Sequence, residues 1–140
     1  MKQARAFAAL AAAAVLAAQP ASASAEVVKL SATLSGAGET AGGDPDGSGR
    51  FTVEIDAEAG DFCYTLSTAK IAKATAAHVH EGVAGTEGKP LGTLSVASDM
   101  CLALSPEVLK AIVAAPGDYY INVHTADFPK GAVRGQLERK

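Results

Sequence analysis

The chain has 140 residues, with 12 lysines and arginines, 15 aspartates and glutamates and three histidines, for a net charge of −3. Aromatic residues make up 5% of the sequence, and the basic residues form no cluster. An acidic chain without a basic patch argues against nucleic acid and against an anionic membrane surface as partners.

The N-terminal segment matches a secretory signal peptide. Lys2 and Arg5 give it a positive start, and Phe7 to Ala18 forms an apolar run. This run is about a dozen residues long, whereas a membrane span needs roughly 20. Ala23-Ser24-Ala25 then has the small-x-small pattern of a signal-peptidase site. We therefore predict a signal peptide over residues 1–25 and export to the periplasm or the medium, with an uncleaved anchor as the alternative.

The exported part, residues 26–140, has the length of a single domain and contains both cysteines. Without Lys2 and Arg5 it keeps 10 basic and 15 acidic residues, a net charge of −5. Disulfides persist outside the cytoplasm, so we predict a bond between Cys63 and Cys101. A pair of metal thiolates or two buried thiols are the alternatives.

Strand patterns dominate the exported part. Phe51, Val53 and Ile55 alternate with polar residues, which is typical of a half-buried strand. A short turn separates this run from a second alternating run, and the two together predict a hairpin. The predicted strands in chain order are residues 27–36, 50–56, 62–67, 75–80, 91–96, 118–125 and 133–138.

One helix is predicted, at about residues 105–115. Ser105 suits the N-cap position and Pro106 the first helical position, and Pro116-Gly117 ends the helical pattern. Many short strands with glycine-rich turns and one short helix predict a mainly β fold, an antiparallel β-sandwich or barrel.

One glycine-rich turn matches part of a calcium-binding loop. Asp44, Asp46 and Ser48 occupy the first ligand positions of an EF-hand loop, and Gly49 its invariant glycine. The bidentate glutamate of position 12 is replaced by Ile55, and strands rather than helices flank the loop. We interpret the segment as a turn before a strand, with a weak calcium site as the alternative.

The histidines are the main candidates for chemistry. His78 and His80 are two residues apart on a predicted strand, so they project from one face while Val79 points to the core. His124 follows Val123 on another predicted strand and projects from an outer face in the same way. If the two strands are neighbours, the three imidazoles converge on one ion. Imidazole suits copper, zinc, nickel and iron; the alternative is three surface histidines bonded to their neighbours.

Other polar residues lie close to the histidines in the sequence. Glu81 and Asp127 could each supply a fourth ligand or fix an imidazole, or they could be loop charges. Tyr120 and Asn122 share the face of His124 and could line the same patch. No nucleophile elbow, P-loop or dinucleotide fingerprint occurs, so the sequence offers no other catalytic motif.

Three segments resemble successive blocks of the CHRD domain, the module that is repeated in chordin and occurs singly in exported bacterial proteins. They are GDPDGSGRFTVEID, TAAHVHEGVAGTEGKP and LSPEVLKAIVAAPGDYYINVHTADFPKGAVRGQLE. The resemblance covers residues 27–138 and implies a β-sandwich module without an established enzymatic activity, one that in chordin binds growth factors outside the cell. Its histidine-bearing blocks fall on His78, His80 and His124. The cysteine pair departs from the usual pattern.

The stretch AAHVHEG is also similar to the histidine pair of copper,zinc superoxide dismutases. In those enzymes the pair binds copper on the outer face of a Greek-key β-barrel, which implies a Greek-key-like arrangement here. The resemblance assigns His78 and His80 to the pair and His124 to the distant ligand. The enzymes' dinuclear site needs further histidines, and this chain has none left. A mononuclear site with three histidines remains.

These observations lead to one main hypothesis and two alternatives. The main hypothesis is a metal site, copper first and zinc second, that sequesters or delivers the ion outside the cytoplasm through His78, His80 and His124. The first alternative is a non-metal adhesion or interaction module that binds exported proteins through loops 81–90 and 126–131. The second is a redox enzyme with an open copper coordination position, for which the sequence shows no substrate pocket.

Overall fold

The computed structural model describes residues 26–97 and 99–140, so the predicted signal peptide lies outside the described residues. The strands are β1 Val27–Ser35, β2 Ser48–Asp56, β3 Asp61–Ala69, β4 Ala74–Glu81, β5 Lys89–Leu94, β6 Met100–Ala103, β7 Tyr119–Thr125, β8 Val133–Gln136 and β9 Glu138–Arg139. The helical elements are α1 Pro106–Ala114 and two 3-10 helices, η1 Gly36–Gly38 and η2 Pro116–Asp118. The mainly β prediction is confirmed.

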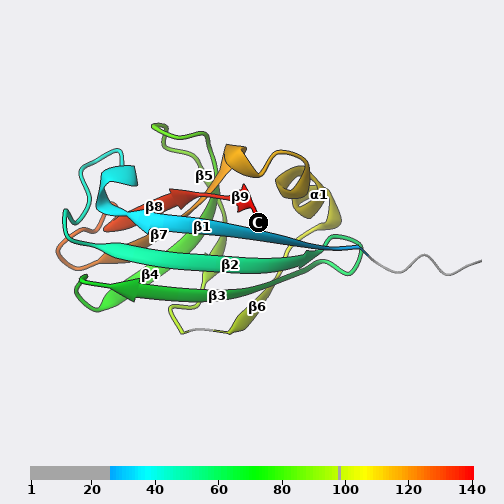
Figure 1. Ribbon diagram of the computed structural model, residues 1–140, viewed down its shortest axis with the longest axis horizontal. Helices are drawn as coiled ribbons and strands as arrows, with labels where there is room; N and C mark the ends of the chain where they lie inside the picture. Colours follow the sequence, from blue (N-terminus) through cyan, green and yellow to red (C-terminus); the bar gives the residue numbers. More distant parts are fainter. Residues whose placement is uncertain (1–25, 98) are drawn as a thin grey trace, which may run out of the picture.

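The strands form one antiparallel sheet that curls into a nearly closed barrel. Its order is β5-β4-β7-β8-β1-β2-β3-β6, with β9 beside β1. Figure 1 shows β1, β2 and β3 side by side in one layer, with β4 and β7 passing behind them. The edges are β5 and β6, and a side chain added at Gly92 of β5 would collide with Leu102 of β6. Side chains therefore fill the seam between the edges.

Alternation along the strands builds the core between these layers. Phe51 and Ile55 of β2 are fully buried, as are Ile121 and Val123 of β7. Phe51 stacks on Tyr64 of β3 with ring centroids 5.5 Å apart. The apolar positions predicted from period-2 patterns are thus the ones that fill the barrel.

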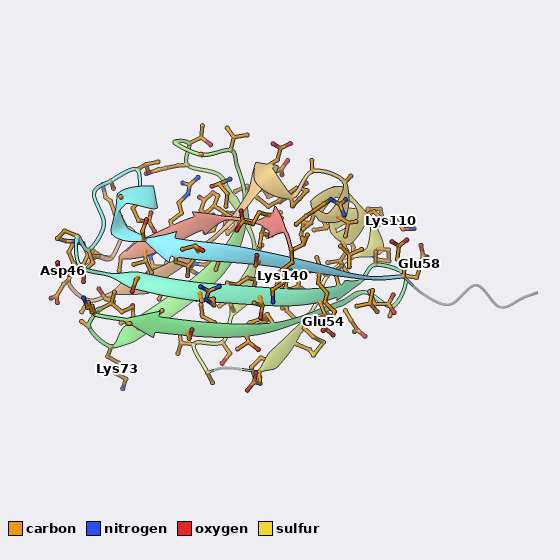
Figure 2. The ribbon with its side chains drawn as sticks, in the orientation of Figure 1. Asp46, Glu54, Glu58, Lys73, Lys110 and Lys140 are labelled. Atoms are coloured by element: carbon orange, nitrogen blue, oxygen red, sulfur yellow. A yellow bond between two sulfur atoms is a disulfide. The ribbon has the colours of Figure 1, made fainter. Side chains whose placement is uncertain are left out.

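Helix α1 packs at one end of the barrel. The Ser105 side chain accepts a hydrogen bond from a backbone N–H of the first turn, as the cap prediction requires. Leu109 and Ile112 are fully buried. Lys110 on the outer side forms an ion pair of 2.8 Å with Glu58, which Figure 2 shows at the same end of the molecule. Among the described residues, no helix has the length and apolar character needed to cross a membrane.

The disulfide predicted between Cys63 and Cys101 is present. The two residues are directly opposite each other on β3 and β6. Strand β6 was not predicted from the sequence. Four residues without clear alternation give no strand signal, and pairing with β3 together with the disulfide supplies what the local pattern lacks.

The predicted last strand is shorter than expected. β8 ends at Gln136, although the backbone N–H of the buried Leu137 still donates to the Tyr119 carbonyl of β7 at 2.9 Å. The chain then changes partner, and β9 pairs with β1. The interpretation of the aspartate-containing segment as a turn is confirmed, since the Asp44 carboxylate accepts the Asp46 backbone N–H at 3.2 Å.

Candidate metal centre

The three histidines come together on the outer face of β4 and β7. These strands are antiparallel neighbours, and His78 lies opposite Asn122, two residues before His124. On the other face Val79 and Val123 are fully buried in the core. The strand adjacency that the sequence argument needed is present, and the predicted parity is confirmed.

The ring nitrogens are close enough to share one ion. His78 Nδ1 and His124 Nε2 are 3.1 Å apart, and one nitrogen from each of the three rings lies within 4.8 Å of the others. With metal–nitrogen bonds of about 2.0 Å, two nitrogens on one tetrahedral or square-planar ion are roughly 2.8–3.4 Å apart. The pair formed by His78 and His124 already has this separation. A nitrogen of His80 lies within 4.8 Å of both.

Backbone carbonyls hold two of the rings and fix their tautomers. His80 Nδ1 lies 3.0 Å from the Gly88 carbonyl oxygen, and His124 Nδ1 lies 3.0 Å from the Pro129 carbonyl oxygen. A carbonyl only accepts, so we assign the proton to Nδ1 in both rings. Their Nε2 atoms are therefore unprotonated, and that of His124 faces His78 Nδ1. His80 Nε2 is buried and has no hydrogen-bond partner.

A stack of three side chains supports His80. The Tyr120 ring lies parallel to it with centroids 4.7 Å apart, and the Arg134 guanidinium lies 3.4 Å from the Tyr120 ring centroid. Sterics place the imidazole and the guanidinium on opposite faces of the tyrosine. The Tyr120 hydroxyl also accepts a hydrogen bond from the Gly88 backbone N–H at 3.1 Å. Gly88 is therefore bonded to both stacked rings, to His80 through its carbonyl and to Tyr120 through its N–H.

The loop that carries Gly88 is clamped by two side chains of β8, the buried Arg134 and the half-buried Gln136. Arg134 donates to the Thr86 carbonyl at 2.6 Å and to the Val83 carbonyl at 3.0 Å. Gln136 donates to the Gly82 carbonyl at 2.9 Å. Arg134 is only 2% exposed, and its guanidinium donates to carbonyl oxygens and lies over an aromatic face. The loop is thus built as a fixed wall beside the histidines.

The surroundings favour neutral imidazoles. Burial lowers the pKa of His78, and the neighbouring His124 and His80 lower it further. Burial also lowers the pKa of His80, while its hydrogen bond to the Gly88 carbonyl works in the opposite direction. A neutral imidazole has the lone pair that a metal ion needs, so these rings are ready to bind near neutral pH.

A cavity of about 260 Å³ opens beside the cluster. Its lining consists of Glu39, Thr40, His80, Glu87, Gly88, Tyr120, Asn122, His124, Lys130 and Arg134. At the rim the Thr40 hydroxyl donates to Glu87 at 3.3 Å. Burial raises the pKa of Glu39 to about 7, although the Arg134 charge opposes the shift. The histidines therefore border an open, polar hollow instead of a flat surface.

Comparison with known proteins agrees with the sequence blocks and the fold. The sequence model of the CHRD domain matches residues 30–137. The chain belongs to the CHRD domain family. No curated protein and no solved structure matches it. In this CHRD domain, the disulfide and the extracellular character of the family favour a location outside the cell.

The two carboxylates considered as additional ligands lie apart from the cluster in this CHRD domain. Glu81 borders a hollow with Tyr119 and α1, on the face opposite His80. Asp127 is exposed, in the loop between β7 and β8. The group of converging ligand atoms consists of the three histidines.

Sequence reasoning missed two residues of the CHRD site. Arg134 lies in the RGQL segment, but only the fold shows that it is buried and that it clamps the loop 82–88. Glu39 lies just after η1, far from every histidine in the sequence. No local pattern connects it to them, and only the pairing of β1 with β8 brings it near the site.

Proposed function

We propose that this CHRD domain, residues 26–140, is exported by a signal peptide ending near Ala25 and binds one copper ion. The ligands are His78 Nδ1, His80 Nε2 and His124 Nε2. The protein sequesters the ion or delivers it in the periplasm or the medium.

The observation that carries this proposal is the fixing of two imidazoles through their far nitrogens. Ligating histidines in metalloproteins donate their other ring N–H to a carboxylate or a backbone carbonyl, which sets the tautomer and the orientation. His80 and His124 both do so, through Gly88 and Pro129. A pair of histidines that served only as surface residues would have no need of a buried, unpartnered Nε2 such as that of His80.

The third ligand, His78, implies a proton rearrangement on metal binding. His124 Nδ1–H is used on Pro129, so in the metal-free protein His78 Nδ1–H donates to His124 Nε2. An ion between these nitrogens replaces that hydrogen bond. The His78 proton then belongs on Nε2, and since the ring stays neutral, binding at this ring needs no net release of a proton.

Ligand chemistry and number favour a mononuclear copper site. Among divalent first-row ions, nitrogen ligands bind copper most tightly; zinc, which they bind less tightly, is the alternative. The chain has no histidine beyond these three. The position on the outer face of the barrel, beside an open cavity, suits exchange of the ion with another carrier better than burial in the core would.

The proposal is tested by copper uptake of the metal-free exported domain. The wild-type protein should take up one Cu(II) per chain, with nitrogen hyperfine structure in its electron paramagnetic resonance (EPR) spectrum. His124→Ala should weaken binding by about 100-fold or more. Asp127→Asn, in the same loop region but outside the cluster, serves as the matched control and should bind as the wild type does. Equal affinity of His124→Ala and the wild type would rule out the three-histidine site.

A further inference from the structure

The cavity beside the histidines collects every unsatisfied polar side-chain atom found in the interior of the described ranges, 26–97 and 99–140. These buried atoms without a hydrogen-bond partner are Glu39 Oε1, His80 Nε2 and Asn122 Oδ1. All three residues line the same cavity. Buried polar groups are rarely left unpaired, so three at one place point to a ligand that the cavity is built to receive.

All three atoms have the same hydrogen-bonding character. Asn122 Oδ1 is a carbonyl oxygen, and Glu39 Oε1 is a carboxyl oxygen that accepts when ionised. His80 Nε2 carries a lone pair, because its Nδ1–H is used on Gly88. Acceptor atoms are satisfied by a cation or by hydrogen-bond donors, so we expect this cavity to hold a cation together with a ligand that has O–H or N–H groups.

Basic residues of the cavity leave the Glu39 carboxyl unpaired. The Nη1 and Nη2 atoms of Arg134 donate to Thr86, Val83 and Gln136. The ion pairs within the described residues are Lys29 with Glu54 and Lys110 with Glu58, so neither Arg134 nor Lys130 pairs with Glu39. Its carboxyl group lies over Gly131, where any side chain would collide with it. The acceptor is thus held in place without a protein donor.

Glu39 is outside the group of atoms that could bind the ion directly. That group contains the three histidines and no carboxylate. Three protein ligands leave at least one coordination position of a copper or zinc ion open. A small molecule at that position would occupy the cavity between the ion and the unpaired acceptors.

We propose that the open coordination position takes a small ligand with O–H or N–H donors, water first, and that Glu39 and Asn122 accept its hydrogen bonds. This inference rests on the proposed metal site. It also predicts selectivity. Small anions that only accept, such as azide, meet the Glu39 carboxylate and the Asn122 carbonyl oxygen in the cavity. They should therefore bind less tightly than they would without Glu39, even though Lys130 and Arg134 also line the cavity.

Azide titration of the copper-loaded protein tests the inference, at a pH above the Glu39 pKa of about 7 and at low ionic strength. The azide-to-copper charge-transfer band reports binding. Glu39→Gln and Glu39→Ala should each bind azide about tenfold tighter than the wild type, because the carboxylate charge is gone. Glu87→Gln is the matched control. Glu87 is an exposed rim carboxylate already bonded to Thr40, so its removal should change azide affinity by less than about threefold.

Pulsed EPR in H₂O and D₂O gives a second readout. The hyperfine coupling between the copper electron spin and the exchangeable protons of the bound water should change in Glu39→Gln and in Asn122→Ala. The couplings to the histidine nitrogens should stay the same. Equal azide affinities in the wild type and both Glu39 variants, an equal gain in Glu87→Gln, or unchanged exchangeable-proton couplings would overturn this inference alone. Failure of the wild type to take up copper would overturn the metal site and this inference together.

Discussion

His78 Nδ1 lies 3.1 Å from His124 Nε2, although the two residues are 46 positions apart in the sequence. The contact exists because β4 pairs with β7 in the register that sets His78 opposite Asn122. Shifting this register by one residue would turn one of the rings toward the core. The site is therefore as well defined as the strand pair, whose inner face carries the fully buried Val79 and Val123.

Tyr120 should tune the metal site through the His80 ring. Tyr120→Phe keeps the stack but loses the acceptor for the Gly88 N–H, which should destabilise the fold by about 1 kcal/mol. Tyr120→Leu also loses the stack and should weaken copper binding by about tenfold. Calorimetric copper titration and EPR check this. Unchanged affinity and EPR parameters in Tyr120→Leu would show that the stack does not position the ligand.

Arg134 should be necessary for the wall of the cavity. Arg134→Lys keeps the charge but cannot reach two carbonyls in a planar fork or cover the Tyr120 ring, so we expect a loss of about 2–4 kcal/mol in the free energy of unfolding. Urea unfolding measures it, with the exposed Arg50→Lys as the control, expected within about 0.5 kcal/mol of the wild type. A similar small effect for both variants would contradict the clamp.

Much of the fold and the histidine cluster could be predicted from the sequence because both follow from period-2 alternation. The alternation of Phe51, Val53 and Ile55 reports a strand with one buried face. The same parity places His78 and His80 on the face opposite Val79. Adjacency of β4 and β7 is a tertiary property that no local pattern contains, so from the sequence it could be stated only as a condition for the site.

The parts that were missed depend on long-range contacts. Strand β6 is stabilised by the partner β3 and by the bond from Cys101 to Cys63, not by its own four residues. Glu39 and Arg134 are charged residues whose local sequence suggests solvent exposure. Arg134 is buried and Glu39 half-buried beside the histidines because β8 and the segment after η1 come together only in the folded barrel.

Removal of the disulfide should affect stability and leave the metal site intact. Cys63→Ser with Cys101→Ser opens a loop with a sequence separation of 38, which should lower the free energy of unfolding by about 4 kcal/mol in the chain-entropy model. Neither cysteine belongs to the histidine cluster or lines its cavity, so copper stoichiometry should not change while the protein is folded. Unfolding curves measure the loss of stability, and copper uptake measures the stoichiometry. Loss of copper binding in a folded variant would show that the metal site depends on the disulfide.

Glu39 should make the stability of the metal-free protein depend on pH in a definite direction. Its folded pKa of about 7 exceeds the ordinary value of 4.5. The unfolded state therefore loses this proton first, and the contribution of Glu39 to stability falls as pH rises from 4.5 to about 7. The lowered pKa values of His78 and His80 act oppositely, since protonation of the unfolded chain below their ordinary value of 6.5 favours unfolding.

Comparison with Glu39→Gln separates the contribution of the Glu39 carboxyl group to the pH dependence of stability from the contributions of the histidines. The unfolding free energy of the wild type minus that of the variant should decrease with pH through this window and become constant above it. Urea unfolding at a series of pH values gives this difference, with Glu87→Gln as the control for a nearby charge. A difference that does not depend on pH would show that Glu39 titrates as an ordinary exposed carboxyl.

The crystal structure of the copper-loaded protein tests the central claim most directly. Anomalous scattering at the copper edge should give one peak per chain, with His78 Nδ1, His80 Nε2 and His124 Nε2 each about 2.0 Å from it. His80 and His124 should still donate to Gly88 and Pro129. A peak at any other place, or none, with His78 still hydrogen-bonded to His124, would contradict it.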